Sequence, residues 1–261
     1  MGEDKTNNKP VIVIVPGSFS NACSYYALVD RIQGLGYETF VNNLPSTSRH
    51  PPEEPANLQD DAGFFRSIIE KLADQGKNVV VVMHSYGGLV GSEAVKGTAK
   101  ADRQASGKPG GVVKLIYLTA TVLPVGGSMK SESGDPPSGL IEMDQNGFMR
   151  IVGVEAVAQA ALSDVQFDRA VDIVREMPRH SALSFAGELT YPGYKHIPSS
   201  YICCENDCLV SPEIQRKYID RIREATGKEV DVHNLDTGHA PNISATEKLA
   251  QLLVDVVGAS V

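Results

Sequence analysis

The sequence has no tryptophan and only four cysteines among its 261 residues. Three of them, Cys203, Cys204 and Cys208, crowd around the end of one predicted strand, so a disulfide framework spread over the chain is not expected. Adjacent residues of a strand point to opposite faces, which argues against these cysteines as a set of metal ligands. We therefore predict reduced thiols that pack in the core, Cys23 included, and no metal.

Positive charge is also scarce, because 24 Lys and Arg residues stand against 32 Asp and Glu residues, a formal net charge of −8. Phosphate contacts require clustered cations, so we expect no binding to nucleic acid or to anionic membranes. No run approaches the roughly 18 to 20 apolar residues that span a bilayer. The polar start, residues 1–9, lacks the apolar segment of an export signal, and acidic Glu3 weakens the match of residues 2–6 to a myristoylation pattern. We expect a cytoplasmic protein that acts on neutral or cationic small molecules.

What the sequence does contain is an alternation of short apolar runs with helical patterns. Residues 11–15 are a continuous β-branched run ended by Pro16-Gly17, which is typical of a strand buried on both faces of a parallel sheet. Further strands are predicted at 38–41, 79–83, 112–118, 200–204 and 230–232. Helices are predicted at 58–76, from Ser211-Pro212 onward, and at 243–256. The alternation predicts an α/β fold, a single domain over residues 1–261 with a mostly parallel sheet of about six strands and helices on both faces.

The alternation breaks between residues 124 and 198. A polar loop at 130–139 precedes helical patterns near 154–162 and 167–177, which predicts a helical lid inserted after a strand. Ligand sites are mostly apolar, so we expect large apolar side chains to line a substrate cleft, namely Phe19, Met129, Phe148 and Met149. The three in the insertion could instead form the core of the lid, and that alternative stays open.

The segment most informative about chemistry is His84-Ser85-Tyr86-Gly87-Gly88, which follows a buried apolar strand directly. In a nucleophile elbow the serine occupies a strained strand-to-helix turn, and small residues around it let the strand and helix approach closely. Gly87 meets that need. Met83 departs from the usual Gly-x-Ser-x-Gly pattern, so the turn must accommodate a larger side chain there.

A serine hydroxyl is a weak nucleophile and needs a histidine base that a carboxylate orients. Asp207 lies just beyond one predicted strand and His239 just beyond the next, so the chain order is Ser85, Asp207, His239. The carboxyl ends of parallel strands gather at one edge of a sheet, where three such loops can converge. Glu205 and Asp236 are rival acids, but Asp236 is too close to His239 in sequence to orient it easily.

The other histidines are weaker candidates for the base. His84 adjoins the serine and is expected to point elsewhere, whereas His50 and His233 belong to a polar loop and a strand. His180 and His196 fall in or near the insertion, where a surface role and a substrate-facing role both stay open.

With these motifs in place, the chain resembles the α/β-hydrolases, nearest to the small branch that contains plant methylesterases and hydroxynitrile lyases. The resemblance is carried by residues 10–19, 84–88, 117–124, 197–207 and 238–239. In that family the first strand ends in His-Gly, and the amide of the next residue supplies half of the oxyanion hole. Pro16-Gly17 stands here, so the resemblance assigns this amide to Ser18, with Phe19 as the runner-up, and the second amide to Tyr86.

The resemblance implies a serine hydrolase without a cofactor that cleaves an ester, lactone or thioester of a small apolar molecule through an acyl-enzyme. A carbon–carbon bond hydrolase or lyase on the same triad, and a ligand receptor that turns over slowly, are the alternatives. Hydroxynitrile lyases of the branch carry a lysine after the catalytic histidine, and Ala240 stands here, which disfavours that activity. The sequence leaves open whether the protein forms a homodimer.

Overall fold

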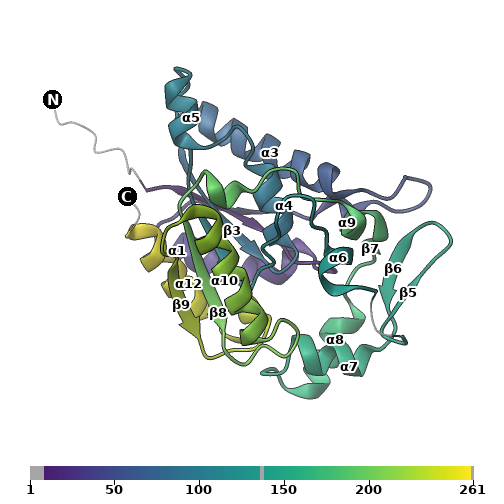
Figure 1. Cartoon of the computed structure of the whole chain (residues 1–261). Coiled ribbons are helices and arrows are strands. Elements are labelled where there is room, and N and C mark those ends of the chain that lie inside the picture. The colour runs from purple at the N-terminus through teal and green to yellow at the C-terminus, as the bar shows by residue number, and fades with distance from the viewer. Residues whose placement is uncertain (1–8, 136–137, 260–261) are drawn as a thin grey trace.

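The apolar runs predicted as strands pair side by side in one six-stranded sheet of the computed structural model, which describes residues 9–135 and 138–259 (Figure 1). The strand order is β2-β1-β3-β4-β8-β9, and every neighbouring pair is parallel. The strands are β1 (Val11–Val15), β2 (Thr39–Val41), β3 (Asn78–His84), β4 (Gly111–Leu118), β8 (Ser199–Cys204) and β9 (Asp231–Leu235). The prediction of a mostly parallel sheet of about six strands is thus confirmed. The myristoylation pattern at residues 2–6 lies outside the described residues.

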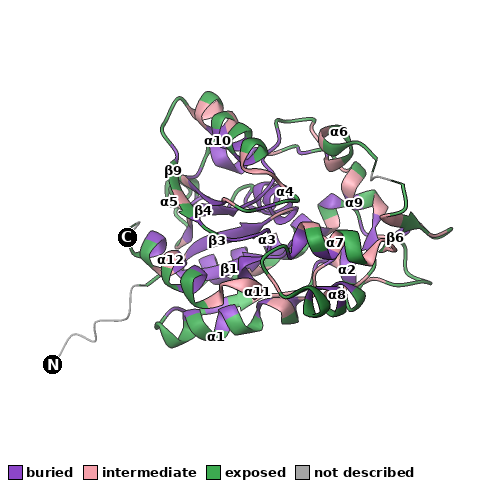
Figure 2. Ribbon diagram, turned by 90° about the horizontal axis from the view of Figure 1, so that it is seen from below, coloured by how far each residue is buried: buried purple, intermediate pink, exposed green. Residues whose placement is uncertain are grey.

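Helices cover both faces of this sheet because successive strand residues point to opposite sides. In β1, Val13 belongs to the apolar core that also holds side chains of α3 (Leu58–Asp74), α4 (Gly87–Ala94) and α10 (Pro212–Thr226). Ile14 belongs to the core on the other face, with side chains of α1 (Tyr26–Gly34) and α12 (Thr246–Gly258). Figure 2 shows the buried strands at the centre and the exposed outer sides of α1 and α10. Four short helices complete the layers: η1 (Ala22–Tyr25), α2 (Pro45–Ser48), α5 (Lys100–Ala105) and α11 (Pro241–Ser244).

Two predicted boundaries differ from the structure. The last strand runs from 231 to 235 rather than 230 to 232, because its pairing with β8 continues to the Cys204 and Leu235 pair. The predicted last helix is split into α11 and α12 at Ala245, whose backbone angles are not helical.

The segment between β4 and β8 contains more than helices. Its elements are α6 (Met129–Ser133), β5 (Ile141–Met143), β6 (Phe148–Ile151), α7 (Val154–Ala161), α8 (Phe167–Arg175), β7 (His180–Ser181), α9 (Ala182–Ala186) and η2 (Gly193–Lys195). The predicted helices correspond to α7 and α8. The antiparallel sheet β5-β6-β7 was not predicted; its hairpin is built on Asp144, whose carboxylate accepts the amide hydrogens of Asn146 and Phe148.

The cysteines divide into two buried and two exposed residues. Cys203 and Cys204 pack in the two cores on either side of the sheet, as predicted. Cys23 and Cys208 are exposed, so the prediction of core packing is wrong for these two. Cys23 lies in η1 and borders the cavity above the serine, and Cys208 lies in the loop between β8 and α10.

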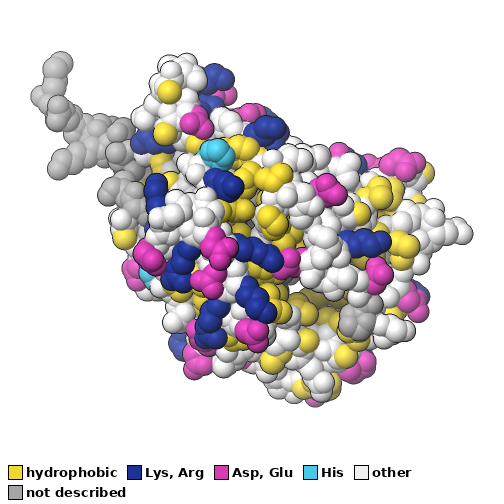
Figure 3. Space-filling model, in the orientation of Figure 1, with side chains coloured by type: hydrophobic (Ala, Val, Ile, Leu, Met, Phe, Trp, Pro, Cys, Tyr) yellow, Lys and Arg dark blue, Asp and Glu magenta, His cyan; other side chains and the backbone are white. Residues whose placement is uncertain are grey.

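Many charged side chains on the outer surface form ion pairs. Figure 3 shows Lys and Arg side chains standing among Asp and Glu side chains on the face that carries α10. Five of the ion pairs involve this helix: Arg216–Glu205, Lys217–Glu213, Arg221–Glu132, Arg223–Asp220 and Arg223–Glu229. Among the described residues, no helix combines the length and apolar character needed to cross a membrane.

Candidate active site

Ser85 occupies the sharp turn between β3 and α4, where its φ of 53° lies in a region that costs energy for a residue with a side chain. Gly87 makes the turn possible, because a Cβ there would collide with the carbonyl oxygen of Val15. Met83 stands where the usual motif has glycine, and its thioether packs against Gly91, a position in α4 that has no room for a Cβ. Gly91, one helical turn after Gly87, therefore provides the space that the larger Met83 side chain needs.

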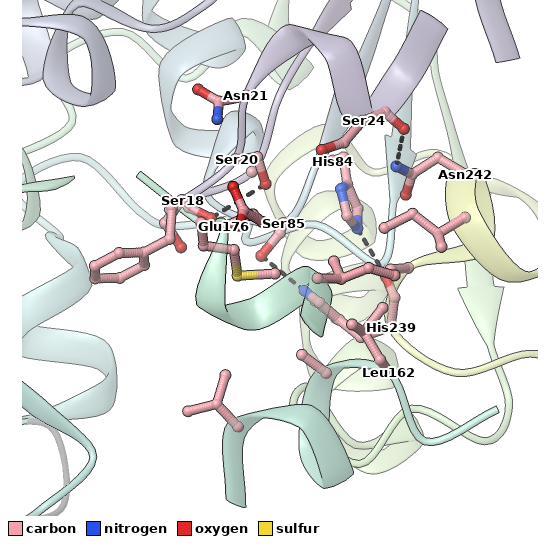
Figure 4. Close-up of a pocket in the computed structure, with 18 of the residues that line it drawn as sticks. Ser18, Ser20, Asn21, Ser24, His84, Ser85, Leu162, Glu176, His239 and Asn242 are labelled. Atoms are coloured by element: carbon pink, nitrogen blue, oxygen red, sulfur yellow. Dashed lines mark hydrogen bonds between the residues drawn. The ribbon is translucent and has the colours of Figure 1, made fainter. Parts of the chain in front are cut away.

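The three strand-end residues singled out from the sequence meet above this turn. The Oγ atom of Ser85 lies 3.0 Å from Nε2 of His239, and Nδ1 of His239 lies 2.7 Å from Oδ2 of Asp207 (Figure 4 shows Ser85 and His239). Asp207 and His239 are 3% and 5% exposed, which shields their contact from solvent. The arrangement forms one continuous line from a hydroxyl through an imidazole to a carboxylate.

Asp207 is held as an anion by four hydrogen bonds. Its Oδ1 accepts the amide hydrogens of Leu209 and Val210, each at 2.8 Å, and its Oδ2 accepts the Thr119 hydroxyl at 2.5 Å as well as the His239 ring. Burial by itself raises the pKa of Asp207, but the bond and charge of His239 together with the other donors outweigh burial and hold the pKa below its ordinary value. A charged Asp207 can in turn stabilise a cationic imidazole.

The rival acids are engaged elsewhere. Glu205 pairs with Arg216 at 3.2 Å, and Asp236 accepts a hydrogen bond from the Asn206 amide at 2.6 Å. Neither of these carboxylates is bonded to His239. Among the three acids considered from the sequence, Asp207 alone reaches the ring.

The loop after β1 presents one unoccupied amide beside the serine. The Gly17 N–H donates to the Tyr25 hydroxyl at 3.1 Å, and the Phe19 N–H points to Nδ1 of His180 at 3.4 Å. Between them, the Ser18 N–H has no hydrogen-bond partner among the described residues. The sequence left Ser18 and Phe19 as alternatives, and the geometry leaves the Ser18 amide as the available donor.

A second amide of this kind belongs to Tyr86, the residue after the serine. Its N–H precedes the first hydrogen bond of α4 and has no partner in the described part of the chain. The Tyr86 side chain points away into the core, where its hydroxyl donates to the buried carboxylate of Asp61 at 3.0 Å. The backbone and the side chain of Tyr86 thus face different surroundings.

His84 does not point away from the site, which corrects the expectation from sequence. Its Nε2 lies 2.8 Å from the carbonyl oxygen of His239, its Nδ1 lies 2.6 Å from the Tyr25 hydroxyl, and its ring packs beside the His239 ring. Burial, and next the charge of His239, lower the pKa of His84 to about 3. His84 is therefore neutral at ordinary pH.

His180 and His196, for which the sequence left a substrate-facing role open, both lie away from the cavity. His180 is fully buried among aromatic rings, and its Nε2 is bonded to the Ser184 hydroxyl at 2.8 Å. His196 is exposed and stacks on Tyr191. Neither belongs to the wall of the cavity above Ser85.

A cavity of about 490 Å³ opens above Ser85 and His239. One side is the loop after β1, with Phe19 and Cys23 in the wall. The opposite side is formed by α7, α8 and the residues that follow them, whose apolar contributions include Val157, Ala161, Leu162, Ile173, Met177 and Pro178. Three charged side chains also border the cavity, namely Arg169 and Asp172 of α8 and Glu176 just after it.

Three of the four residues expected in the cleft lie elsewhere. Phe19 borders the cavity, but Met129, Phe148 and Met149 do not. Phe148 and Met149 are 1% and 6% exposed on β6, the central strand of the small sheet, and Met129 packs against the main core. The physical reason for Phe148 and Met149 is the unpredicted hairpin, which buries their side chains and leaves α7 and α8 to cover the serine.

The pair of helices α7 and α8 is anchored to the loops that carry the acid and the base. The carboxylate of Asp164, between the two helices, accepts the Gly238 N–H at 2.8 Å, and the Ser163 hydroxyl donates to the Asn206 carbonyl at 3.3 Å. Ala240 shares an apolar cluster with the same helices. Hydrogen bonds and apolar contacts therefore connect α7 and α8 to the loops that carry Asp207 and His239.

A parallel sheet with helices on both faces, whose strand ends bring together a strained serine, a histidine and a carboxylate, has the architecture of an α/β-hydrolase. The family model described as the alpha/beta hydrolase family matches residues 12–252, and the chain belongs to this family of enzymes. It is 36% identical over 250 residues to a protein named probable hydrolase R7 of Phoma sp., covering 96% of this chain and 99% of that one.

Solved structures show the same fold. A pyrethroid hydrolase from Sphingobium faniae superimposes with a TM-score of 0.72 at 20% identity, covering 96% of this chain and 98% of the other. An Arabidopsis methylesterase gives a TM-score of 0.71 at 18% identity, covering 96% and 99% of the two chains. The chain is an enzyme of the α/β-hydrolase family.

Proposed function

We propose that the protein is a serine hydrolase that cleaves a carboxylic ester, lactone or thioester of a small, largely apolar molecule. The observation that carries the proposal is the unbroken line from Ser85 Oγ through the His239 ring to Asp207 beneath the cavity. Such a line converts a weakly nucleophilic hydroxyl into a catalytic nucleophile.

In the proposed reaction the Ser85 hydroxyl attacks the carbonyl carbon of the substrate while Nε2 of His239 takes its proton. The negative charge that develops on the carbonyl oxygen is stabilised by the amides of Ser18 and Tyr86. His239 then gives the proton to the departing alcohol or thiol, which leaves an acyl-enzyme. Water, deprotonated by the same imidazole, attacks the acyl carbon and releases the acid and free Ser85.

Asp207 supports both steps in this proposal by keeping Nδ1 of His239 protonated, so that Nε2 faces Ser85 as the acceptor. Its low pKa supports this role, because an ionised carboxylate stabilises the imidazolium that forms twice in the cycle. No cofactor or metal enters the scheme.

We further propose that residues 124–198 act as a lid within a single domain. The apolar side chains of α7 and α8 over the serine favour substrates with an apolar body. The charged side chains of this wall are two acids, Asp172 and Glu176, and one base, Arg169, so the wall offers no cluster of arginines for a phosphate. A cytoplasmic location and a homodimer stay predictions.

The proposal is tested by labelling with a fluorophosphonate and by turnover of a short nitrophenyl ester. We expect the wild type to be labelled at Ser85 and to release nitrophenol, and Ser85→Ala to do neither. Ser67→Ala, which removes an exposed hydroxyl on α3, should match the wild type. Stabilisation by a ligand without labelling or turnover would instead support a receptor.

A further inference from the structure

We propose that Tyr25 and His84 form a neutral hydrogen-bond relay that positions the His239 loop and the Gly17-Ser18 loop against Ser85, and that turnover depends on it. The inference rests on the proposed function, because it assigns positioning residues to the same reaction. Neither side chain takes part in the proton transfers described above.

The distances allow only one arrangement of hydrogens. The His239 carbonyl oxygen, 2.8 Å from Nε2 of His84, can only accept, so Nε2 carries the hydrogen. In a neutral ring Nδ1 is then an acceptor, and the Tyr25 hydroxyl, 2.6 Å away, donates to it. The Tyr25 oxygen accepts the Gly17 N–H at 3.1 Å. The three hydrogen bonds therefore run from the Gly17 N–H to the Tyr25 oxygen, from the Tyr25 hydroxyl to Nδ1 of His84, and from Nε2–H of His84 to the His239 carbonyl.

The relay connects the three loops that the proposed reaction needs. Gly17 immediately precedes Ser18, the proposed oxyanion donor; His84 ends β3 next to Ser85; and the His239 carbonyl belongs to the loop that carries the base. Figure 4 shows His84 beside Ser85 with its bond to the backbone of His239. Loss of one bond would therefore loosen the amide and the imidazole relative to the serine.

Burial keeps the relay uncharged. Tyr25 and His84 are 1% and 4% exposed, and desolvation raises the pKa of the Tyr25 hydroxyl to about 12 while it lowers the pKa of His84. The ring centroids of His84 and His239 are 5.1 Å apart. A cationic His84 at that distance would repel the imidazolium that His239 becomes in the reaction, and a neutral ring does not.

The first test is Tyr25→Phe, which removes one oxygen atom and leaves the ring in place. We expect kcat per active site to fall about 10- to 100-fold with KM little changed, because misplacement of catalytic groups slows the step without removing the cavity wall. The active sites are counted by fluorophosphonate titration, so that a loss of folded protein does not count as a loss of rate.

The matched control is Tyr26→Phe. Tyr26 is the next residue, is 55% exposed, and its hydroxyl has no hydrogen-bond partner in the part of the chain that the structure describes. The same chemical change there should leave kcat and KM at the wild-type values. An unchanged kcat in Tyr25→Phe, or a higher KM at constant kcat, would overturn the relay.

The second test compares His84→Gln with His84→Leu. Glutamine keeps a donor for the His239 carbonyl, whereas leucine keeps neither the donor nor the acceptor, so glutamine should restore part of the lost kcat. Equal kcat values per titrated site would contradict the inference. Retained turnover in Ser85→Ala would instead remove the proposed function, so the two failures are distinguishable.

Discussion

Ser85 combines a strained backbone angle with a hydroxyl that is within bonding distance of His239, and the cost of that strain is tolerable only if the surrounding turn supports it. The support comes from glycines at 87 and 91, which admit the strand and the Met83 side chain. The site therefore depends on the reactive side chains and also on two positions, Gly87 and Gly91, where a side chain would not fit.

Replacing Ser85 by alanine should lower kcat by about 10⁴-fold or more, and His239→Ala should lower it about as much. The double variant should lose little more than either single variant, because a nucleophile and its base act in one step. Steady-state kinetics on the four proteins provides the comparison. Losses that multiply would argue against a shared step.

The choice of acid is tested by Asp207→Asn, which keeps the size of the side chain but removes the charge that fixes the His239 tautomer. We expect kcat/KM to fall by about 10³- to 10⁴-fold. Glu205→Gln and Asp236→Asn are the matched controls, since each makes the same change in a nearby acid that does not contact the ring. A crippling effect of Glu205→Gln would show that the acid is misassigned.

At the scale of secondary-structure elements, α7 and α8 are the main contributors to the cover of the cavity. The hydrogen bond from Gly238 to Asp164 connects them to the loop of His239, so movement of these helices would shift the His239 side chain. The small sheet flanks them in sequence, with β5 and β6 before α7 and β7 after α8, and it buries Phe148 and Met149 of its central strand.

Substrate preference should therefore change with the cavity wall formed by α8 and the residues just after it, and not with the small sheet β5-β6-β7. We predict that wild type has a higher kcat/KM for aryl or medium-chain esters than for acetates of polar alcohols, and that Ile173→Ala and Met177→Ala each reduce that preference about 3- to 10-fold by removing apolar contacts. A panel of nitrophenyl and alkyl esters measures this ratio. The control is Met143→Ala, a change of a methionine that is 66% exposed on β5. A preference that survives both Ile173→Ala and Met177→Ala would exclude this wall from substrate recognition.

At the scale of the whole molecule, one buried carboxylate makes stability depend on pH. Asp61 on α3 is 0% exposed and accepts the Ser46 N–H at 2.8 Å and the Tyr86 hydroxyl at 3.0 Å. Burial, only partly offset by these bonds, raises its pKa from 3.8 to about 6. The folded state thus holds the proton more tightly than the unfolded state.

The contribution of this group to the free energy of unfolding is fully present below pH 3.8 and is lost as the pH rises through about 6. The shift corresponds to about 3 kcal/mol. Urea unfolding from pH 4 to pH 7 should therefore show the wild type losing stability relative to Asp61→Asn, whose side chain does not titrate. Asp30→Asn on α1, an exposed position, is the control and should follow the wild type. Parallel curves for Asp61→Asn and wild type would refute the prediction.

The sequence by itself determined the sheet and the chain order of the site, because both depend on local patterns. Buried parallel strands are continuous apolar runs, and a strand that ends in a serine followed by small residues indicates an elbow. The six-stranded sheet is confirmed, and the residues selected from its loops, Ser85, Asp207 and His239, lie within hydrogen-bond distance of one another.

Only the tertiary structure decided which side chains surround that line. His84 meets the backbone of His239 across 155 residues of sequence, and Thr119 meets Asp207 across 88, so no local pattern marks either contact. The tertiary structure likewise decided that α8 and not Phe148 lines the cavity, because the hairpin that carries Phe148 pairs with β7 and buries that ring. Contacts of this kind follow from how layers pack, and packing is a property of distant segments in three dimensions rather than of neighbours in sequence.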